Sequence, residues 1–138
     1  MCQPATTRPA RTQGMNFVRQ TKRLAIYLRD GLACAYCGQG IETAGVTLSL
    51  DHLQPYSLGG SNSETNLVTC CTRCNSARGN RPVAAFVAVT AAFFNTDAAA
   101  ITARITTSTA RALPLALAKD IIALRGSCAK AIAAGVYY

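Results

Sequence analysis

The sequence predicts an α+β fold, in which a small region of strands and helices is clamped by a four-cysteine zinc site and followed by an alanine-rich helical extension. Three observations predict it. Two Cys-x-x-Cys pairs flank two short segments with strand-like patterning, and helical periodicity fills the chain after Pro82. The length of 138 residues corresponds to one domain, and a hydrophobic content of 50% excludes a chain that is disordered throughout.

The first 20 residues have the composition of a flexible basic tail. They contain Arg8, Arg11 and Arg19, two prolines and no acidic residue. A phosphate-contacting arm and an organellar transit sequence are alternative interpretations. The tail has no apolar secretory core, and no apolar run approaches the ~20 residues of a membrane span. We therefore expect a cytoplasmic protein of bacterial or phage type, without a signal peptide, a transmembrane segment or membrane contacts.

The pattern of residues 21–82 predicts a compact alternation of helices, turns and strands. Residues 22–30 have the spacing of an amphipathic helix that ends at Gly31. Residues 34–38 form a tight turn, in which glycine permits a positive φ. The elements expected next are a strand over 46–50 that ends at Asp51-His52, a loop over 55–64 with Gly59-Gly60, a strand over 67–69 and a helix over 71–78 that ends at Gly79.

Residues 83–138 predict helices. Pro82 suits the start of the first helix, Asp97 can N-cap the second, and Pro114 breaks the chain before a third over 115–125. We expect this extension to supply core packing or an oligomer surface, and a homodimer through its helices is the arrangement considered.

The two cysteine pairs are a strong metal-binding signal. Cys34 and Cys37 have the same spacing as Cys71 and Cys74, so each pair can place two thiolates on one side of a turn. Four sulfurs at about 2.3 Å from the metal complete a tetrahedral zinc site without an open position for water, so the zinc is expected to be structural. A redox dithiol, an iron site and ordinary buried thiols are the alternatives.

The other three cysteines have no partner in this pattern. Seven cysteines are an odd number for a disulfide framework, and a reducing compartment favours metal binding. We expect Cys70 to be a small buried side chain, and we assign no role to Cys2 or Cys128.

Asp51 and His52, the one histidine of the chain, have the chemistry of a phosphodiester-cleaving site. Phosphodiester hydrolysis needs a base that deprotonates water and a divalent cation that neutralises charge on the leaving oxygen. The Asp51 carboxylate and the Asn75 amide oxygen suit a hard cation such as Mg²⁺. On a strand, His52 points away from Asp51 and can act as the base without being a ligand.

These residues together resemble the zinc-containing HNH endonucleases of the ββα-metal, or His-Me finger, type. The match extends from about residue 22 to 82. The residues that carry it are Arg29-Asp30, Cys34-Ala-Tyr-Cys37-Gly38, Leu50-Asp51-His52-Leu-Gln-Pro55, Gly59-Gly60, Asn66-Leu67-Val68 and Cys71-Thr-Arg-Cys74-Asn75-Ser-Ala-Arg78-Gly79. The resemblance implies an HNH nuclease domain over 21–82 with a ββα-metal core.

The resemblance also implies roles for individual residues. His52 would be the general base, Asp51 and Asn75 would hold one Mg²⁺ or Mn²⁺ ion, and Asn66 would brace the active-site loop. DNA would be cleaved to leave 5′-phosphate and 3′-hydroxyl ends. Many members carry histidine where this chain has Asn75, but the resemblance extends to active members with asparagine there.

The basic residues are candidate contacts to nucleic acid. The formal net charge of +8 suits a polyanion without selecting a sequence. Arg78 lies one helical turn after Asn75 and is expected to hold a phosphate at the catalytic site, with an exposed helix charge as the alternative. The other candidates are Arg73 and the basic residues of the first 29 positions, among them Lys22, Arg23 and Arg29.

Two functions compete with the nuclease hypothesis. A non-catalytic, zinc-stabilised nucleic-acid-binding module would use the same scaffold but would not need Asp51, His52 and Asn75. A thiol redox protein would use one cysteine pair and would not bind zinc tightly.

Overall fold

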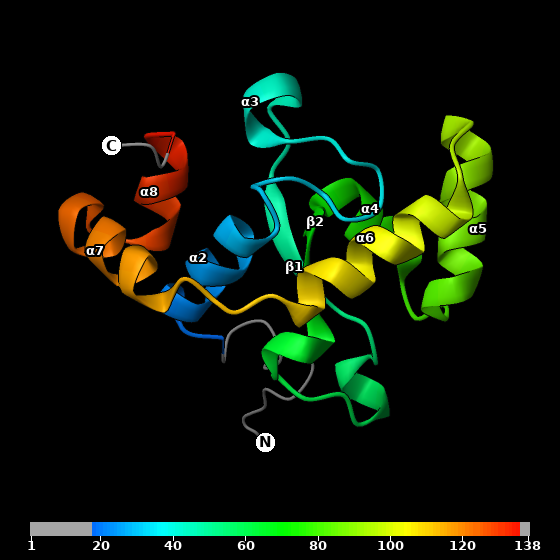
Figure 1. Cartoon of the computed structure of the whole chain (residues 1–138), viewed down its shortest axis with the longest axis horizontal. Coiled ribbons are helices and arrows are strands. Elements are labelled where there is room, and N and C mark those ends of the chain that lie inside the picture. The colour runs from blue at the N-terminus through cyan, green and yellow to red at the C-terminus, as the bar shows by residue number, and fades with distance from the viewer. Residues whose placement is uncertain (1–17, 136–138) are drawn as a thin grey trace, which may run out of the picture.

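The computed structural model describes residues 18–135, in which helices surround a small antiparallel sheet (Figure 1). The predicted flexible tail lies almost entirely outside the described residues. The elements are α2 (Gln20–Arg29), α3 (Ile41–Ala44), β1 (Leu48–His52), the 3-10 turns η2 (Tyr56–Leu58) and η3 (Glu64–Asn66), β2 (Leu67–Cys71), α4 (Thr72–Arg78), α5 (Val83–Phe94), α6 (Ala98–Ala110), α7 (Leu115–Arg125) and α8 (Cys128–Ala133).

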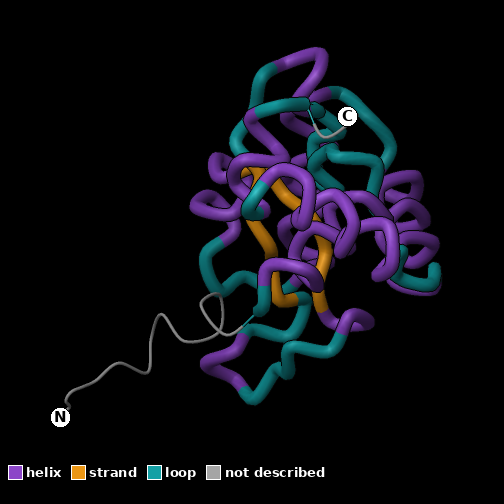
Figure 2. The backbone as a smooth tube through the Cα atoms, turned by 90° about the vertical axis from the view of Figure 1, so that its left-hand side faces the viewer, coloured by secondary structure: helices purple, strands orange, loops and turns teal. Residues whose placement is uncertain are grey.

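The sheet of the described region consists of β1 and β2, paired antiparallel from Leu48↔Cys71 to His52↔Leu67. Figure 2 shows the two strands side by side in the middle of the molecule, with helices around them. The first strand begins two residues later than Val46 and includes Asp51 and His52, because both residues continue the ladder opposite β2. The backbone that carries the proposed base is therefore fixed by sheet hydrogen bonds.

The end of α2 is joined to the sheet by a buried ion pair. Arg29 Nε donates to Asp30 Oδ1 at 2.7 Å, and Arg29 Nη2 donates to the Leu67 carbonyl at 2.7 Å. Asp30 Oδ2 accepts a hydrogen bond from Thr69 N at 2.8 Å. Arg29 is only 5% exposed, so the expectation that it contacts nucleic acid is wrong. Its charge instead satisfies backbone and carboxylate groups inside the fold.

The C-terminal helices share their two hydrophobic clusters with the rest of the chain. One cluster joins Leu24 of α2 to Ala118 of α7 and Ala131 of α8. The other joins Tyr36 and the cysteine pairs to Phe86 of α5 and to Ile101 and Ile105 of α6. Figure 1 shows α5 and α6 on one side of the sheet and α7 and α8 on the other. The extension is thus part of the same folded unit.

The structure confirms most predicted helix limits and adds two short helices. Asp97 caps α6 through a hydrogen bond from Ala99 N, and α7 begins directly after Pro114. The short helices α3 and α8 were not predicted. Ser127 caps α8 by accepting a hydrogen bond from Lys130 N. None of the described helices is long and apolar enough to cross a membrane.

Candidate functional site: a four-cysteine cluster and a neighbouring cavity

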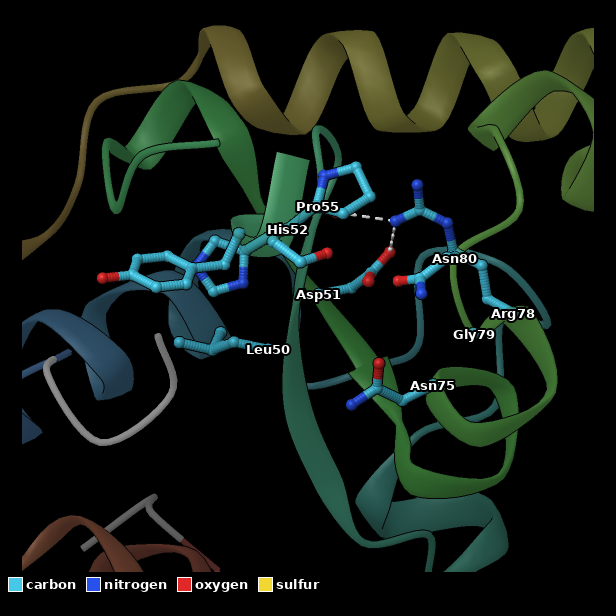
Figure 3. A pocket seen from close by; sticks show the side chains of 10 residues that line it. Leu50, Asp51, His52, Pro55, Asn75, Arg78, Gly79 and Asn80 are labelled. Carbon is cyan, nitrogen blue, oxygen red and sulfur yellow. Dashed lines mark hydrogen bonds and ion pairs between the residues drawn. The ribbon is translucent and has the colours of Figure 1, made fainter. Parts of the chain in front are cut away.

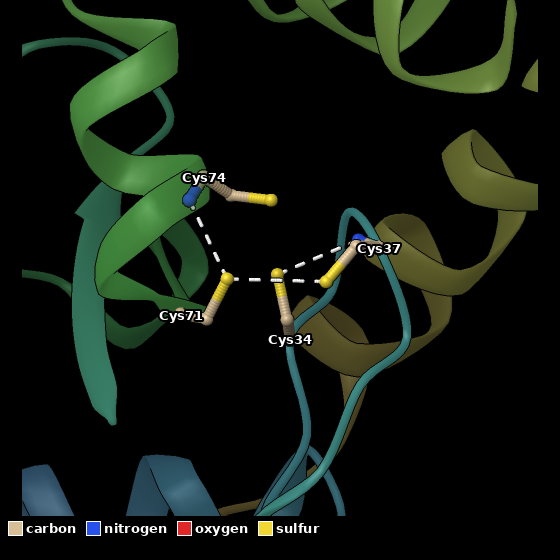
Figure 4. Close-up of side chains that lie close together, drawn as sticks. All are labelled: Cys34, Cys37, Cys71 and Cys74. Atoms are coloured by element: carbon tan, nitrogen blue, oxygen red, sulfur yellow. Dashed lines mark hydrogen bonds between the residues drawn. The ribbon is translucent and has the colours of Figure 1, made fainter. Parts of the chain in front are cut away.

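Four cysteine sulfurs meet where the turn after α2 approaches the junction of β2 and α4 (Figure 4). All four Sγ atoms of Cys34, Cys37, Cys71 and Cys74 lie within 4.8 Å of one another, and those of Cys37 and Cys71 are 3.9 Å apart. Tetrahedral zinc with bonds of about 2.3 Å places its sulfurs about 3.8 Å apart. The donor set therefore fits one zinc ion, as predicted.

Hydrogen bonding within the cluster separates the pKa values of its thiols. The hydrogen bond from Cys74 lowers the pKa of Cys34 to about 5, and burial raises the pKa of Cys37 to about 11. The contact with Cys34 also raises the pKa of Cys74. A metal ion that binds all four sulfurs displaces the protons that remain on them. Burial raises the pKa of Cys70, which lies outside the cluster, as expected for a small core side chain.

A cavity of about 710 Å³ lies between the end of β1 and α4 and is lined by the predicted catalytic residues Asp51, His52 and Asn75 (Figure 3). Asp51 and His52 leave β1 in opposite directions, and Asn75 of α4 lies on the side of Asp51. The strand and the helix thus bring residues from positions 51, 52 and 75 to one cavity.

The Asp51 carboxylate is held through one of its two oxygens. Arg78 Nη1 donates to Asp51 Oδ2 at 2.7 Å, and the Tyr36 hydroxyl donates to the same oxygen. Burial and the neighbouring Asp51 carboxylate raise the pKa of Tyr36, so the phenol keeps its proton. Among the described residues, Asp51 Oδ1 accepts no hydrogen bond. This oxygen remains available to a cation.

Asn62 fixes the proton of His52. Its amide oxygen lies 2.7 Å from His52 Nε2, and a carbonyl oxygen can only accept. In the neutral imidazole the proton is therefore on Nε2 and the lone pair is on Nδ1. The ring also contacts Tyr56 in a tilted arrangement, with centroids 5.8 Å apart. This tautomer has a free basic nitrogen, as a general base requires.

Asn66 braces the loop that carries Asn62. Its Oδ1 accepts from Gln54 N at 2.8 Å, and its Nδ2 donates to the Ser61 carbonyl at 2.9 Å. Gly60 completes the brace, because a Cβ at this position would lie 1.7 Å from the Gln54 carbonyl oxygen. The two sides of the loop therefore approach each other at a distance that only glycine allows.

Asn75 is placed by its own amide nitrogen. Nδ2 donates to Ser49 Oγ at 3.2 Å, and the amide oxygen points toward Asp51 (Figure 3). A carboxylate and an amide oxygen that face one open cavity fit a hard divalent cation. The donor set therefore suits Mg²⁺ or Mn²⁺, in contrast to the sulfur cluster nearby.

Comparisons with known proteins point to one family. Residues 34–88 match the family described as HNH endonuclease, and we call this part of the chain the HNH segment. Over 57 residues, the chain is 40% identical to the CRISPR-associated endonuclease Cas9 of Corynebacterium diphtheriae. The alignment covers 41% of this chain and 5% of that protein, so the chain spans a small part of its relative. No solved structure matches the chain.

Within the HNH segment, Arg78 has a different environment from the one expected. It is 1% exposed, and its guanidinium bonds to Asp51 and to the carbonyls of His52, Leu53 and Arg81 at 2.6–2.9 Å. The alternative of an exposed helix charge is therefore wrong. The guanidinium of Arg78 has no exposed N–H group for the predicted phosphate contact, because its donors already bond to acceptors inside the protein. The geometry instead suits a residue that orients Asp51.

The other predicted nucleic-acid contacts lie outside the cavity. Lys22 Nζ donates to the carbonyl of Asn62 and lies 3.8 Å from a Glu64 carboxylate oxygen. Arg23 lies 3.4 Å from the Tyr27 hydroxyl. Arg73 is exposed and bonds Gln39 on the turn between the cysteine pairs. Lys22 thus contacts the same loop that orients His52.

Three residues of the site were missed by sequence reasoning. Tyr36 lies inside the first cysteine pair, and its link to Asp51 depends on how the turn packs against β1. Asn62 is one of several polar residues in the loop, and only its position beside His52 distinguishes it. The adjacent glycines Gly59 and Gly60 indicated a close backbone contact, but the sequence did not show which group makes that contact.

Proposed function

We propose that the HNH segment is the catalytic part of a metal-dependent endonuclease that hydrolyses phosphodiester bonds of DNA. The observation that carries the proposal is that Asp51, His52 and Asn75 all line one cavity, with His52 Nε2 held 2.7 Å from Asn62 Oδ1. A binding module would not need an oriented histidine and two oxygen donors in the same cavity. The family match of residues 34–88 supports the same activity.

Each residue has a distinct part in the proposed reaction. His52 Nδ1 removes a proton from the attacking water, and Asn62 keeps the ring oriented while it does so. Asp51 and Asn75 would hold one Mg²⁺ or Mn²⁺ ion, which supplies charge neutralisation at the leaving oxygen. Arg78 orients Asp51, and Asn66 fixes the loop that carries Asn62. Cleavage on this scheme leaves a 5′-phosphate and a 3′-hydroxyl.

The zinc cluster would be structural in this scheme. Four protein sulfurs leave no position for water, and the cluster joins the turn after α2 to the β2–α4 junction. The junction also carries Asn75. Zinc bound by Cys34, Cys37, Cys71 and Cys74 would therefore hold one wall of the cavity in place.

Contacts to the DNA backbone are proposed for the basic residues outside the cavity. The net charge of +8 provides a general attraction to phosphates. Arg73 is exposed, whereas Lys22 and Arg23 are partly buried on α2, where Lys22 contacts the active-site loop. These side chains would position the duplex without reading its sequence.

A homodimer through the C-terminal helices remains a proposal about assembly. Leu115, Leu117 and Leu124 of α7 are 49%, 53% and 70% exposed. Two copies paired through these leucines could deliver two nicks to one duplex. A monomeric mass by light scattering at assay concentration would exclude this arrangement.

The nuclease proposal is tested by plasmid cleavage. Supercoiled DNA is incubated with the zinc-loaded protein and Mg²⁺ or Mn²⁺, and we expect nicked or linear product that disappears with EDTA. His52→Ala should remove the activity while it retains one zinc per chain. Equal cleavage by the variant would refute the proposed role of His52. Salt-sensitive DNA binding without cleavage under either ion would favour the non-catalytic module.

A further inference from the structure

Tyr36 lies between two zinc ligands in the sequence and touches the carboxylate of the cavity. Its hydroxyl donates to Asp51 Oδ2, the oxygen that also accepts from Arg78. The side chain is 1% exposed, so this contact is made inside the core. The turn that carries Cys34 and Cys37 is thus joined directly to a proposed cation ligand.

The C-terminal helices hold the same turn from other directions. Arg104 of α6 donates from Nε to the Ala35 carbonyl at 2.9 Å and from Nη2 to the Tyr36 carbonyl at 3.2 Å. Phe86 of α5 meets the Tyr36 ring edge to face, with centroids 4.9 Å apart. Backbone and ring of Tyr36 are therefore both fixed by residues of the extension.

These contacts form a continuous physical connection. It begins at α5 and α6, passes through the turn between the first two zinc ligands, and ends at one carboxylate oxygen. With Oδ2 occupied by two donors, the rotation of the Asp51 carboxylate is fixed and Oδ1 is the oxygen left for a cation. Donors behind a metal ligand commonly set its orientation and contribute to metal affinity.

We propose that Tyr36 is a positioning residue that couples the zinc-binding turn and helices α5 and α6 to the cation-binding carboxylate of Asp51. The inference rests on the proposed function, in which Asp51 holds the divalent cation. It assigns a role in the active site to a C-terminal extension whose sequence carries no catalytic motif. A Tyr36 that only fills the core would affect stability but not the affinity for the cation.

The test is the affinity of the zinc-loaded protein for Mn²⁺, measured from the electron paramagnetic resonance signal of free Mn²⁺. Tyr36→Phe removes the hydroxyl and keeps the ring against Phe86. We expect its Kd for Mn²⁺ to rise by about tenfold, with one zinc still bound per chain and cleavage largely restored at saturating Mn²⁺. An unchanged Kd would overturn the proposal.

Tyr27→Phe is the matched control. Tyr27 is also buried, at 4% exposure, but it lies on α2 and its hydroxyl contacts Arg23. The substitution deletes the same atom from the core without touching Asp51. The proposal requires an unchanged Mn²⁺ affinity in this variant, and an equal loss in both variants would overturn it.

Arg104→Gln tests the connection from the extension. It removes the guanidinium that donates to the carbonyls of Ala35 and Tyr36. We expect a smaller rise in the Kd for Mn²⁺ than in Tyr36→Phe. Combined with Tyr36→Phe, it should cause no further rise, because the connection is already broken. Independent, additive effects would refute coupling through Tyr36. Should Tyr36→Phe fail to fold, an unchanged Kd in Arg104→Gln alone would overturn the proposal.

Asp51→Ala separates this inference from the proposed function, because it removes both carboxylate oxygens. If Asp51→Ala leaves Mn²⁺ binding intact, Asp51 is not a cation ligand, and both its role in the proposed function and the coupling through Tyr36 fail. If Asp51→Ala abolishes binding while Tyr36→Phe does not change it, the coupling through Tyr36 alone is wrong.

Discussion

The proposed zinc site and the proposed cation site both use residues of α4 but are built by opposite rules. The four-cysteine cluster takes all its donors from cysteines, with its sulfurs within 4.8 Å of one another. The cavity presents oxygen donors from a strand and a helix and has a volume of about 710 Å³. A closed soft site stabilises structure, whereas an open hard site can admit a substrate.

The comparison also explains how each region is held. Cysteine ligands are oriented by the metal they bind, so the cluster needs little support from other side chains. Asp51 and His52 are instead oriented by protein donors and acceptors, namely Tyr36, Arg78 and Asn62. The first region should therefore be sensitive to its four ligands, and the second also to residues that never touch substrate.

We expect the largest effect on stability and cleavage when a ligand of the four-cysteine site is removed. Cys71→Ser removes one zinc ligand and leaves three sulfurs at the β2–α4 junction. Because metal binding supplies folding free energy, we expect zinc loss, a lower thermal midpoint and no measurable cleavage. Cys70→Ser is the control, since Cys70 is buried next to Cys71 but lies outside the cluster. A zinc affinity equal to that of the wild type in Cys71→Ser would show that Cys71 is not a zinc ligand.

His52→Ala should affect only the open site. A positioned general base contributes about 10²–10⁴-fold to rate, so we expect cleavage to fall by that factor while zinc content and thermal midpoint stay close to wild type. Cleavage is measured as initial rates on supercoiled plasmid at saturating Mn²⁺. Parallel loss of zinc and activity would contradict the separation of the two regions.

Gly60→Ala tests the loop that supports His52. Its Cβ would lie 1.7 Å from the Gln54 carbonyl oxygen, so the loop must shift, at a cost of about 1–3 kcal/mol in the free energy of unfolding. We expect a marked loss of cleavage with zinc retained. Urea denaturation measures the stability change.

Gly45→Ala is the matched control for this loop variant. Gly45 has φ 63° but open space around its Cα, so alanine there meets backbone strain without a collision. It lies after α3, away from the cavity. Equal losses of activity in both variants would show that the close contact between Gly60 and the Gln54 carbonyl oxygen is not needed for cleavage.

The sequence predicted the closed site more completely than the open one, for a physical reason. Cysteine spacing specifies all four zinc ligands, and the pattern of β1, β2 and α4 follows from local periodicity. Asp51, His52 and Asn75 were also identified from residue type and motif. Tyr36, Asn62 and Gly60 were not, because their contacts depend on how the turn and the loop pack against β1.

The burial of Arg29 and Arg78 could not be predicted from the sequence either. Each was a candidate contact to nucleic acid in the sequence, yet each is buried among carbonyls and one carboxylate. Helical periodicity places Arg78 on the face of Asn75 but does not show that β1 presents acceptors to it. The extension after Pro82 had readable helix limits, while its contribution to both hydrophobic clusters required the tertiary structure.

Arg73→Ala should have the smallest effect and tests the surface near the closed site. Arg73 is exposed on α4 and does not line the cavity that contains Asp51 and His52. If it contacts a phosphate, its loss should weaken binding equally for all DNA sequences and reduce the slope of log K against log salt by about 1. Fluorescence anisotropy across a salt series measures this slope. Lys119→Ala is the control, because it removes one positive charge from α7, far along the chain from the HNH segment. An equal change of slope in both variants would assign the effect to net charge, whereas a change confined to Arg73→Ala would place the DNA along α4.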